Sequence, residues 1–167
     1  MQFNVTKFPI VILSTPRSGS TVLAYTLQEQ YDSLEIFNEP YMNNTMKQFH
    51  EYALKEDRYI LKTHVMDLNK ADDNVVLDKI KNNQCYVIRI RRRDVVKQIT
   101  SYYIEANRGI FGYYTDTELP NNVNDPIPID QLKYYLTASE LLENNKVTSN
   151  TDLPIDLDLW YEDLEFP

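Results

Sequence analysis

The feature that most constrains this chain is a short apolar run, Phe8–Thr15, which leads into a loop containing a proline and a glycine. A continuous apolar run of this length is typical of a strand that is buried on both faces of a sheet. The segment that follows, Ser20–Gln30, places apolar residues at helical spacing. The sequence therefore predicts a strand, a tight loop and a helix in direct succession.

The same alternation of strands and helices continues along the chain. Further strands are predicted at Arg58–Val65, Gln84–Arg91 and Leu157–Leu164. Helices are predicted at Thr45–Glu56, Asp72–Asn82, Asp94–Asn107 and Ile129–Lys146. This alternation indicates an α/β fold, a three-layer sandwich around a central, mainly parallel sheet. In such sheets ligands bind beyond the carboxyl ends of the strands, which is where Arg17, His64 and Arg93 fall.

A chain of 167 residues is expected to form one domain, 1–167. Its segment Gly109–Asp130 contains two glycines, three prolines and three asparagines, and predicts a long loop that is functional or mobile. No stretch approaches the length of a transmembrane helix and Met1–Lys7 lacks signal-peptide features, so we expect a cytoplasmic protein without a membrane partner. The lone Cys85 lies in an apolar run and is expected to be a small core residue.

The charge of the chain is acidic overall but unevenly distributed. A net charge of −8 argues against nucleic-acid binding, which requires a broad basic surface. Basic residues nevertheless crowd into one short segment: Arg89, Arg91, Arg92, Arg93 and Lys97. This cluster indicates either a binding site for a small anion or a solvated basic edge.

The loop Thr15–Thr21, which reads T-P-R-S-G-S-T, has the properties of a phosphate-binding turn. A loop between a strand and a helix presents backbone N–H groups and the positive end of the helix dipole to an anion. Gly19 lets the backbone approach closely, and the Arg17 guanidinium suits phosphate or sulfate oxygens. No lysine follows Gly19, so the loop differs from the nucleoside-triphosphatase motif and does not imply a metal ion.

This loop resembles the 5′-phosphosulfate loop of the sulfotransferases that use 3′-phosphoadenylyl sulfate (PAPS), P-[KR]-[ST]-G-[ST]-[ST]. The resemblance implies a P-loop-like sulfotransferase fold in a minimal version, with PAPS as cofactor and 3′-phosphoadenosine 5′-phosphate (PAP) as product. The residues that it assigns to the 5′-phosphate and the sulfate are Pro16, Arg17, Ser18, Gly19, Ser20 and Thr21. In this family an arginine and a serine eight residues later hold the 3′-phosphate, and Arg93 and Ser101 match that spacing.

The resemblance extends to the end of the sequence. Tyr161–Leu164 resembles the Y-E-D-L string that closes a late strand in many sulfotransferases, which is a structural more than a catalytic signature. Larger members continue with a basic segment that covers the nucleotide. Because this chain stops at Pro167, we expect that cover to come from the loop 109–130, to come from a second subunit of a homo-oligomer, or to be lacking.

Two residues are candidates for the base that takes the proton from an acceptor hydroxyl. His64 lies in a K-T-H string that cytosolic sulfotransferases carry at the end of this strand, where the histidine is the base and the lysine contacts the sulfate. Glu39, in N-E-P-Y, lies at about the offset where carbohydrate sulfotransferases have a glutamate base. The resemblance implies that Lys62 and Arg17 stabilise the negative charge of the transferred sulfuryl group. Both bases remain candidates at this point.

The leading interpretation is a PAPS-dependent sulfotransferase that acts on a hydroxyl of a carbohydrate or small metabolite, without a required metal. Aromatic residues such as Tyr102 and Tyr113 could line a cleft for a sugar or could belong to the core. Two alternatives stay open. One is a small-molecule kinase with a phosphate-binding loop, and the other is a PAP-binding protein that has lost catalysis.

Overall fold

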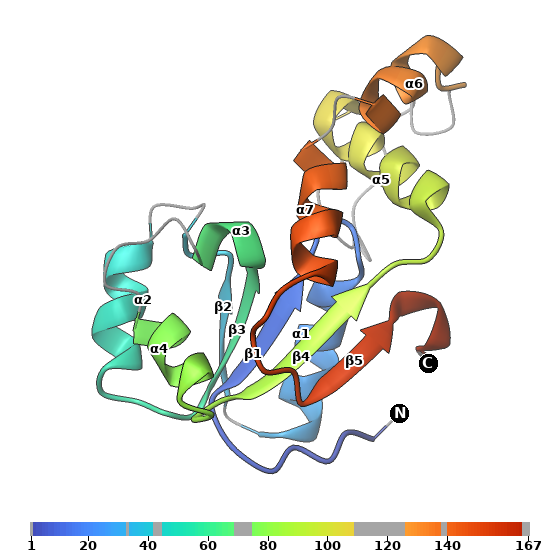
Figure 1. The fold of residues 1–167 in the computed structure, drawn as a ribbon. Helices are drawn as coiled ribbons and strands as arrows, with labels where there is room; N and C mark the ends of the chain where they lie inside the picture. The colour runs from blue at the N-terminus through green and yellow to red at the C-terminus, as the bar shows by residue number, and fades with distance from the viewer. Residues whose placement is uncertain are drawn as a thin grey trace.

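The computed structural model describes residues 2–32, 34–41, 45–68, 75–108, 126–137 and 140–164. Its centre is a sheet of five parallel strands in the order β2-β3-β1-β4-β5 (Figure 1). The strands are β1 (Ile10–Ser14), β2 (Glu35–Asn38), β3 (Tyr59–His64), β4 (Tyr86–Arg91) and β5 (Leu157–Trp160). The predicted α/β fold with a mainly parallel sheet is therefore confirmed.

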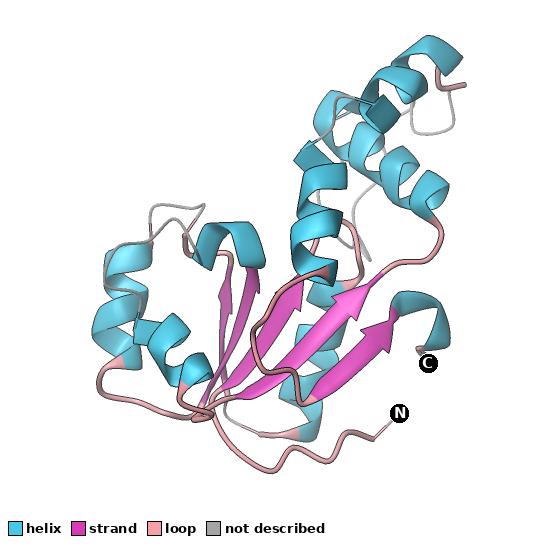
Figure 2. Ribbon diagram, in the orientation of Figure 1, coloured by secondary structure: helices cyan, strands magenta, loops and turns pink. Residues whose placement is uncertain are grey.

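Helices cover both faces of the sheet and complete a three-layer sandwich (Figure 2). One face carries α1 (Ser20–Gln30). The opposite face carries α2 (Met46–Ala53), α3 (Val65–Leu68), α4 (Val75–Lys81) and α7 (Glu140–Ser149). Two further helices, α5 (Val95–Arg108) and α6 (Ile129–Thr137), pack against each other and project beyond the carboxyl ends of the strands (Figure 1). None of the described helices is both long and apolar enough to cross a membrane.

Strand alternation divides the core into two halves. On β1, Ile10 and Ile12 are fully buried toward α1, whereas Val11 and Leu13 are fully buried toward α2 and α4. A central strand that is buried on both faces needs apolar side chains on both faces. For this reason β1 is a continuous run of apolar residues in the sequence. Each such side chain contributes about 1.5–3 kcal/mol when it leaves water. Cys85 is buried in the α2–α4 half, as predicted, and burial raises the pKa of its thiol to about 12.

The structure departs from the predicted elements in the middle of the chain. It adds β2 and α3, two short elements that have no clear apolar period. It also shows two helices where the sequence predicts one over Ile129–Lys146. These two helices have different neighbours: α6 packs against α5, whereas α7 packs against α3 and β4. Residues 138–139, between these two helices, lie outside the described part of the chain.

Two further differences concern the long loop and the last strand. The predicted loop Gly109–Asp130 falls largely on residues 109–125, which lie outside the described ranges, and α6 begins at Ile129. The last strand ends at Trp160 and is followed by a short 3₁₀ helix, η1 (Tyr161–Asp163). This turn brings the ring of Tyr161 against Gly19 in the loop after β1.

Candidate active site

A cavity of about 580 Å³ opens at the carboxyl edge of the sheet. Its walls come from the loop after β1, the segments that follow β2, β3 and β4, and residues of α5, α7 and η1. These segments converge because every strand of a parallel sheet ends on the same side. The predicted site residues that line the cavity are Pro16, Arg17, Gly19, Ser20, Thr21, Glu39, Lys62, His64 and Ser101.

The loop after β1 presents the open end of α1 to the cavity. Gly19 is the N-cap of α1 with φ 84°, and no side chain caps the helix. The first N–H groups of a helix lack intrahelical partners and can bind an anion. Arg17, at φ 61°, holds a left-handed conformation that costs a non-glycine residue about 1–2 kcal/mol. Such backbone strain is concentrated at functional sites.

Ser18 is the one residue of the predicted loop motif that stays outside the cavity wall. Its side chain is fully buried, and its Oγ has no hydrogen-bond partner among the described residues. The structure therefore presents the loop to the cavity through the residues on either side of Ser18, namely Arg17 and Gly19.

Arg17 joins the loop to α5. Its Nε donates a hydrogen bond to Ser101 Oγ (2.8 Å), and its Nη1 lies 3.3 Å from Glu105 Oε1. Ser101 and Glu105 are four residues apart and therefore lie on one face of α5. The structure thus brings together Arg17 and Ser101, which the family resemblance assigns to different phosphates.

The arginines of β4 and of the turn after it separate onto two sides. Along β4, Ile88 and Ile90 pack toward α1, so Arg89 and Arg91 face the opposite side of the sheet. Arg92 follows the alternation of the isoleucines and lines the cavity. There its Nη1 donates a hydrogen bond to the carbonyl oxygen of Arg17 (3.1 Å).

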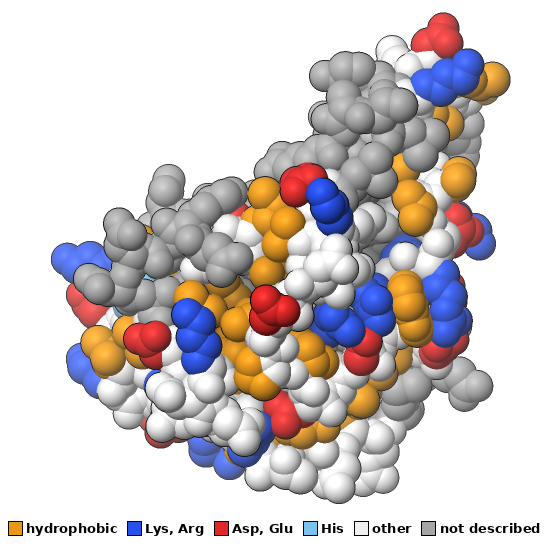
Figure 3. Space-filling view, viewed as in Figure 1, with side chains coloured by type: hydrophobic (Ala, Val, Ile, Leu, Met, Phe, Trp, Pro, Cys, Tyr) orange, Lys and Arg blue, Asp and Glu red, His pale blue; other side chains and the backbone are white. Residues whose placement is uncertain are grey.

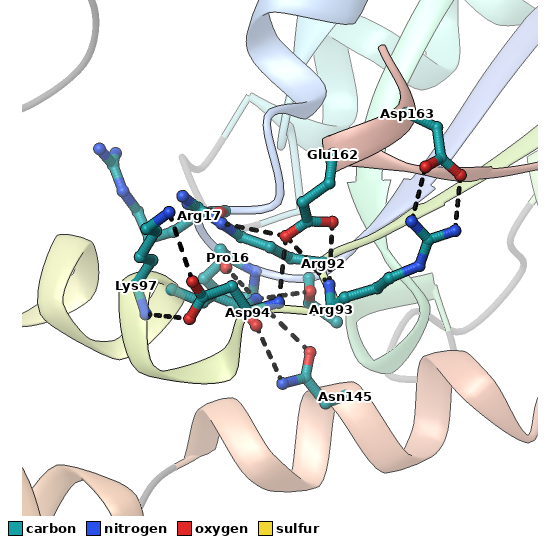
Figure 4. A network of polar contacts seen from close by, with 11 residues as sticks. Pro16, Arg17, Arg92, Arg93, Asp94, Lys97, Asn145, Glu162 and Asp163 are labelled. Carbon is teal, nitrogen blue, oxygen red and sulfur yellow. Dashed lines mark hydrogen bonds and ion pairs between the residues drawn. The ribbon is translucent and has the colours of Figure 1, made fainter.

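The other arginines of the basic cluster pair with carboxylates away from the cavity. Arg89 and Arg91 share Asp158 of β5, at 2.5 and 2.6 Å. Arg93 donates two hydrogen bonds of 2.6 Å to Asp163, and its side chain is 51% exposed (Figure 4). Basic and acidic side chains accordingly lie side by side over the β4–β5 side of the surface (Figure 3). Of the basic residues in this cluster, Arg92 alone lines the cavity that the sequence predicts as an anion site.

Lys62 links the phosphate-binding loop to a candidate base. Lys62 and His64 alternate with Ile60 on the face of β3 that α1 covers. Lys62 Nζ donates a hydrogen bond to Thr21 Oγ1 (2.9 Å) and lies 2.8 Å from Glu39 Oε1. Glu39, at φ 48°, is a second non-glycine residue of the cavity in the left-handed region. A positive charge therefore stands between the start of α1 and the Glu39 carboxylate.

The two candidate bases occupy neighbouring positions. His64 Nε2 lies 3.4 Å from Glu39 Oε1, and both residues line the cavity. On the other side of the ring, His64 Nδ1 lies 3.2 Å from Asp67 Oδ2. The side chains of His64 and Asp67 are both buried. A hydroxyl group bound beside Lys62 would meet both candidates.

Sequence reasoning missed several residues of this cavity. Asp67 follows His64 by three residues, and that spacing is a signal that could have identified it. Arg92 could have been identified from the alternation of apolar and basic residues along β4. Glu105 and Asn144 have no local signal, because α5 and α7 reach the cavity only through tertiary packing.

Contacts from two distant segments fix the loop after β1. On one side, the ring of Tyr161 packs on Gly19 and lies 4.8 Å from the Arg92 guanidinium. On the other side, the fully buried Gln98 of α5 donates a hydrogen bond to the carbonyl oxygen of Pro16 (2.7 Å). The loop is therefore fixed by segments that lie far from it in the sequence.

η1 also anchors the start of α5 (Figure 4). The Glu162 carboxylate accepts hydrogen bonds from the N–H groups of Arg93 and Asp94 (both 3.0 Å). Burial raises the pKa of Glu162, but these hydrogen bonds outweigh it and hold that pKa below its ordinary value. Asp94 Oδ1 in turn accepts a hydrogen bond from the N–H of Lys97 (2.9 Å), so Asp94 caps the start of α5. The Y-E-D string thus has structural contacts with both the loop and α5.

Comparison with known proteins supports the fold. No protein-family model and no curated protein matches the sequence. Among solved structures, the chain is similar to a mouse sulfotransferase crystallised in complex with PAP, with a TM-score of 0.52 and 16% sequence identity. The match covers 95% of this chain and 52% of the mouse chain, so this chain spans about half the length of that neighbour. The chain therefore has a sulfotransferase-like fold.

Proposed function

We propose that this chain is a PAPS-dependent sulfotransferase whose cavity holds the nucleotide together with a carbohydrate or small-metabolite acceptor. The contact of Lys62 with Thr21 on one side and with Glu39 on the other carries this proposal. Lys62 stands between the phosphate-binding loop and a candidate base, where the negative charge of a transferred sulfuryl group would need stabilisation. The sulfotransferase-like fold supports the same assignment.

The cavity has the size and the donors that such a nucleotide requires. Its volume of about 580 Å³ lies in the ordinary range for small-molecule sites. The uncapped start of α1, with the hydroxyls of Ser20 and Thr21, would hold the 5′-phosphate and the sulfate. When bound, PAPS would supply a sulfuryl group whose bond to phosphate oxygen breaks as its bond to the acceptor oxygen forms.

For the 3′-phosphate we assign Arg92 together with Ser101. Arg92 lines the cavity, where its guanidinium donates a hydrogen bond to the carbonyl oxygen of Arg17. A guanidinium in this position can form charge-assisted hydrogen bonds to a phosphate. Arg93, which matches the family spacing, is occupied by Asp163.

The acceptor side of the cavity is polar. Either His64 or Glu39 would take the hydroxyl proton, and Asp67 and Asn144 also line the cavity. Carboxylate and amide groups suit a molecule with many hydroxyls, because they accept and donate hydrogen bonds in fixed directions. The ring of Tyr102, which also lines the cavity, offers a sugar an apolar face.

The test is the transfer of radiolabelled sulfate from PAPS to a panel of monosaccharides, oligosaccharides, phenols and steroids. We expect the wild-type chain to label a carbohydrate or a small polar alcohol in the presence of EDTA. Lys62→Met, which removes the charge and keeps the length, should lower the transfer rate about 100-fold or more. Lys97→Met is the matched control, because the Lys97 side chain is 75% exposed on α5.

Two other outcomes would overturn the proposal. Magnesium-dependent phosphoryl transfer from ATP, without sulfate transfer from PAPS, would favour a kinase. Tight PAP binding without transfer to any acceptor would favour a nucleotide-binding protein that has lost catalysis.

A further inference from the structure

The side-chain amide of Gln98, on α5, is fully buried behind the loop after β1. Its Nε2 donates hydrogen bonds to the carbonyl oxygen of Pro16 (2.7 Å) and to Thr15 Oγ1 (2.9 Å). Its Oε1 accepts a hydrogen bond from Asn145 Nδ2 of α7 (3.2 Å). This one side chain therefore connects the loop with two helices that follow it in the sequence.

The orientation of the Gln98 amide follows from the chemistry of its partners. A carbonyl oxygen only accepts hydrogen bonds, so the NH2 group of the amide, and not its oxygen, faces Pro16. An NH2 group has two hydrogens, and the oxygens of Pro16 and Thr15 lie at the two shortest distances from it. The amide oxygen then faces Asn145, whose own NH2 group donates to it. Both hydrogens of the Gln98 amide are thus directed to the loop.

The hydrogen bond to Pro16 acts on the backbone of Arg17. The Pro16 carbonyl belongs to the planar peptide unit that includes the Arg17 nitrogen, so Gln98 holds the plane that precedes Arg17. The carbonyl oxygen of Arg17 accepts a hydrogen bond from Arg92 Nη1 (3.1 Å), which holds the plane that follows it. The φ and ψ angles of Arg17 lie between these two planes. Its left-handed conformation, with φ 61°, is therefore held from both sides.

The same face of α5 also holds the side chain of Arg17. Gln98 and Ser101 are three residues apart in α5 and are neighbours on the helix surface. Ser101 Oγ accepts the hydrogen bond from Arg17 Nε (2.8 Å), and both of these residues line the cavity. A left-handed conformation is unfavourable for a residue with a side chain, so it persists only where the surroundings hold it. The direction of the guanidinium consequently depends on the hydrogen bonds behind it.

We propose that Gln98 is a positioning residue that fixes the backbone of Arg17 and thereby directs its guanidinium toward the bound phosphosulfate. This role rests on the proposed function and deepens it. Because Gln98 is fully buried behind the loop, it acts through Arg17 and not by contact with the nucleotide. Asn145 supports the same arrangement from α7, since its NH2 group keeps the Gln98 oxygen turned away from the loop.

The position of Arg17 can be followed without a nucleotide, through the signal of its Nε–H group in ¹H–¹⁵N spectra. The signal is identified by its absence in Arg17→Ala. We expect slow exchange of this hydrogen with water, because Nε donates to Ser101. Gln98→Met keeps the length of the side chain and removes both donors, so the exchange should become about tenfold faster or more. Unchanged exchange in Gln98→Met would overturn the inference.

Two further variants distinguish positioning from a general loss of stability. Asn145→Asp places a carboxylate beside the Gln98 amide, which attracts the NH2 group away from Pro16, so the Arg17 exchange should again become faster. If Gln98→Met does not fold, this variant decides the question alone. Ile99→Val loosens a buried position of α5 and offers the loop no hydrogen bond, so it should leave the exchange within about twofold of wild type. An equal acceleration in Ile99→Val would mean that α5 contributes only packing.

Binding and turnover separate this inference from the proposed function. Gln98→Met should weaken PAP binding about tenfold, but less than about twofold in the Arg17→Ala background, because it acts through Arg17. If the wild-type chain transfers sulfate and the two losses of affinity multiply, the positioning role fails and the sulfotransferase stands. If neither PAP binding nor sulfate transfer is found but the Arg17 exchange depends on Gln98 as described, the proposed function fails and the positioning of Arg17 stands.

Discussion

The ring of Tyr161 occupies the space in which any side chain at position 19 would have to lie. A Cβ atom added to Gly19 would stand 2.1 Å from Tyr161 Cδ2 and 2.4 Å from its Cε2. Gly19 also has φ 84°, a conformation that costs glycine little and other residues more. The glycine of the phosphate-binding loop is thus required by its own backbone and by the segment after β5 that closes against it.

Gly19→Ala should therefore destabilise the whole fold, and not only the binding of a nucleotide. The left-handed conformation costs alanine about 1–2 kcal/mol, and the displaced Tyr161 ring adds to this. We expect the free energy of unfolding in urea to fall by about 2 kcal/mol or more. In the double variant with Tyr161→Ala the steric part is relieved, so the losses should be less than additive. An unfolding free energy of Gly19→Ala within about 0.5 kcal/mol of wild type would contradict this account.

Arg92 and Arg93 are neighbours in the sequence and should differ sharply in PAP binding. Arg92 lines the cavity, whereas Arg93 is half exposed and bound to Asp163. Arg92→Ala should weaken PAP binding about tenfold or more, because a charged hydrogen bond to a phosphate is lost. Arg93→Ala should change the PAP affinity less than about threefold. Calorimetric titration measures both, and the opposite order would restore the assignment that follows from the motif spacing.

Glu105 should oppose the binding of an anion. Its Oε1 lies 3.3 Å from Arg17 Nη1, so a phosphate or sulfate bound at Arg17 would approach a carboxylate. Glu105→Gln removes this charge and keeps a hydrogen-bond acceptor for Arg17, and it should raise PAP affinity about three- to tenfold. The gain should shrink in high salt, because mobile ions screen the repulsion. Weaker PAP binding in this variant would instead mean that the charge of Glu105 orients Arg17 for the ligand.

Asp158 should make the protein less stable in acid. Burial raises the pKa of Asp158, but the hydrogen bonds and charges of Arg89 and Arg91 outweigh it and lower that pKa below the ordinary value of 3.8. A carboxylate with a lowered folded-state pKa contributes stability above its unfolded pKa, and this stability is lost as the pH falls through the folded pKa. Asp158→Asn should lower the free energy of unfolding at pH 7, and its difference from wild type should shrink below about pH 4. A difference that does not vary with pH would refute the ionic role.

Most of the fold could be predicted because its signals are local. The apolar run of β1 and the helical spacing of Ser20–Gln30 each depend on a few neighbouring residues. The short strand β2 could not be predicted, because it is stabilised by its pairing with β3 and not by its own composition. The predicted helix Ile129–Lys146 covers two helices, α6 and α7, whose different packing partners are not visible in the sequence.

In the candidate site, too, some side chains could be predicted from local sequence and others could not. Lys62, His64 and Glu39 could be identified from their strings, and the structure brings them together in one cavity. The family spacing points to Arg93, whereas the strand alternation along β4 brings Arg92 to the cavity wall. Glu105 reaches Arg17 only because α5 crosses above the loop. Contacts between distant segments are what the sequence does not reveal.

The most direct measurement of the central claim is a calorimetric titration of the wild-type chain with three nucleotides: PAP, adenosine 5′-monophosphate and magnesium ATP. A site built for two separate phosphates should bind PAP with a Kd below about 1 mM and adenosine 5′-monophosphate about tenfold more weakly or worse. Magnesium ATP should bind no more tightly than the monophosphate. An absence of PAP binding, or binding of magnesium ATP as tight as that of PAP, would contradict the account.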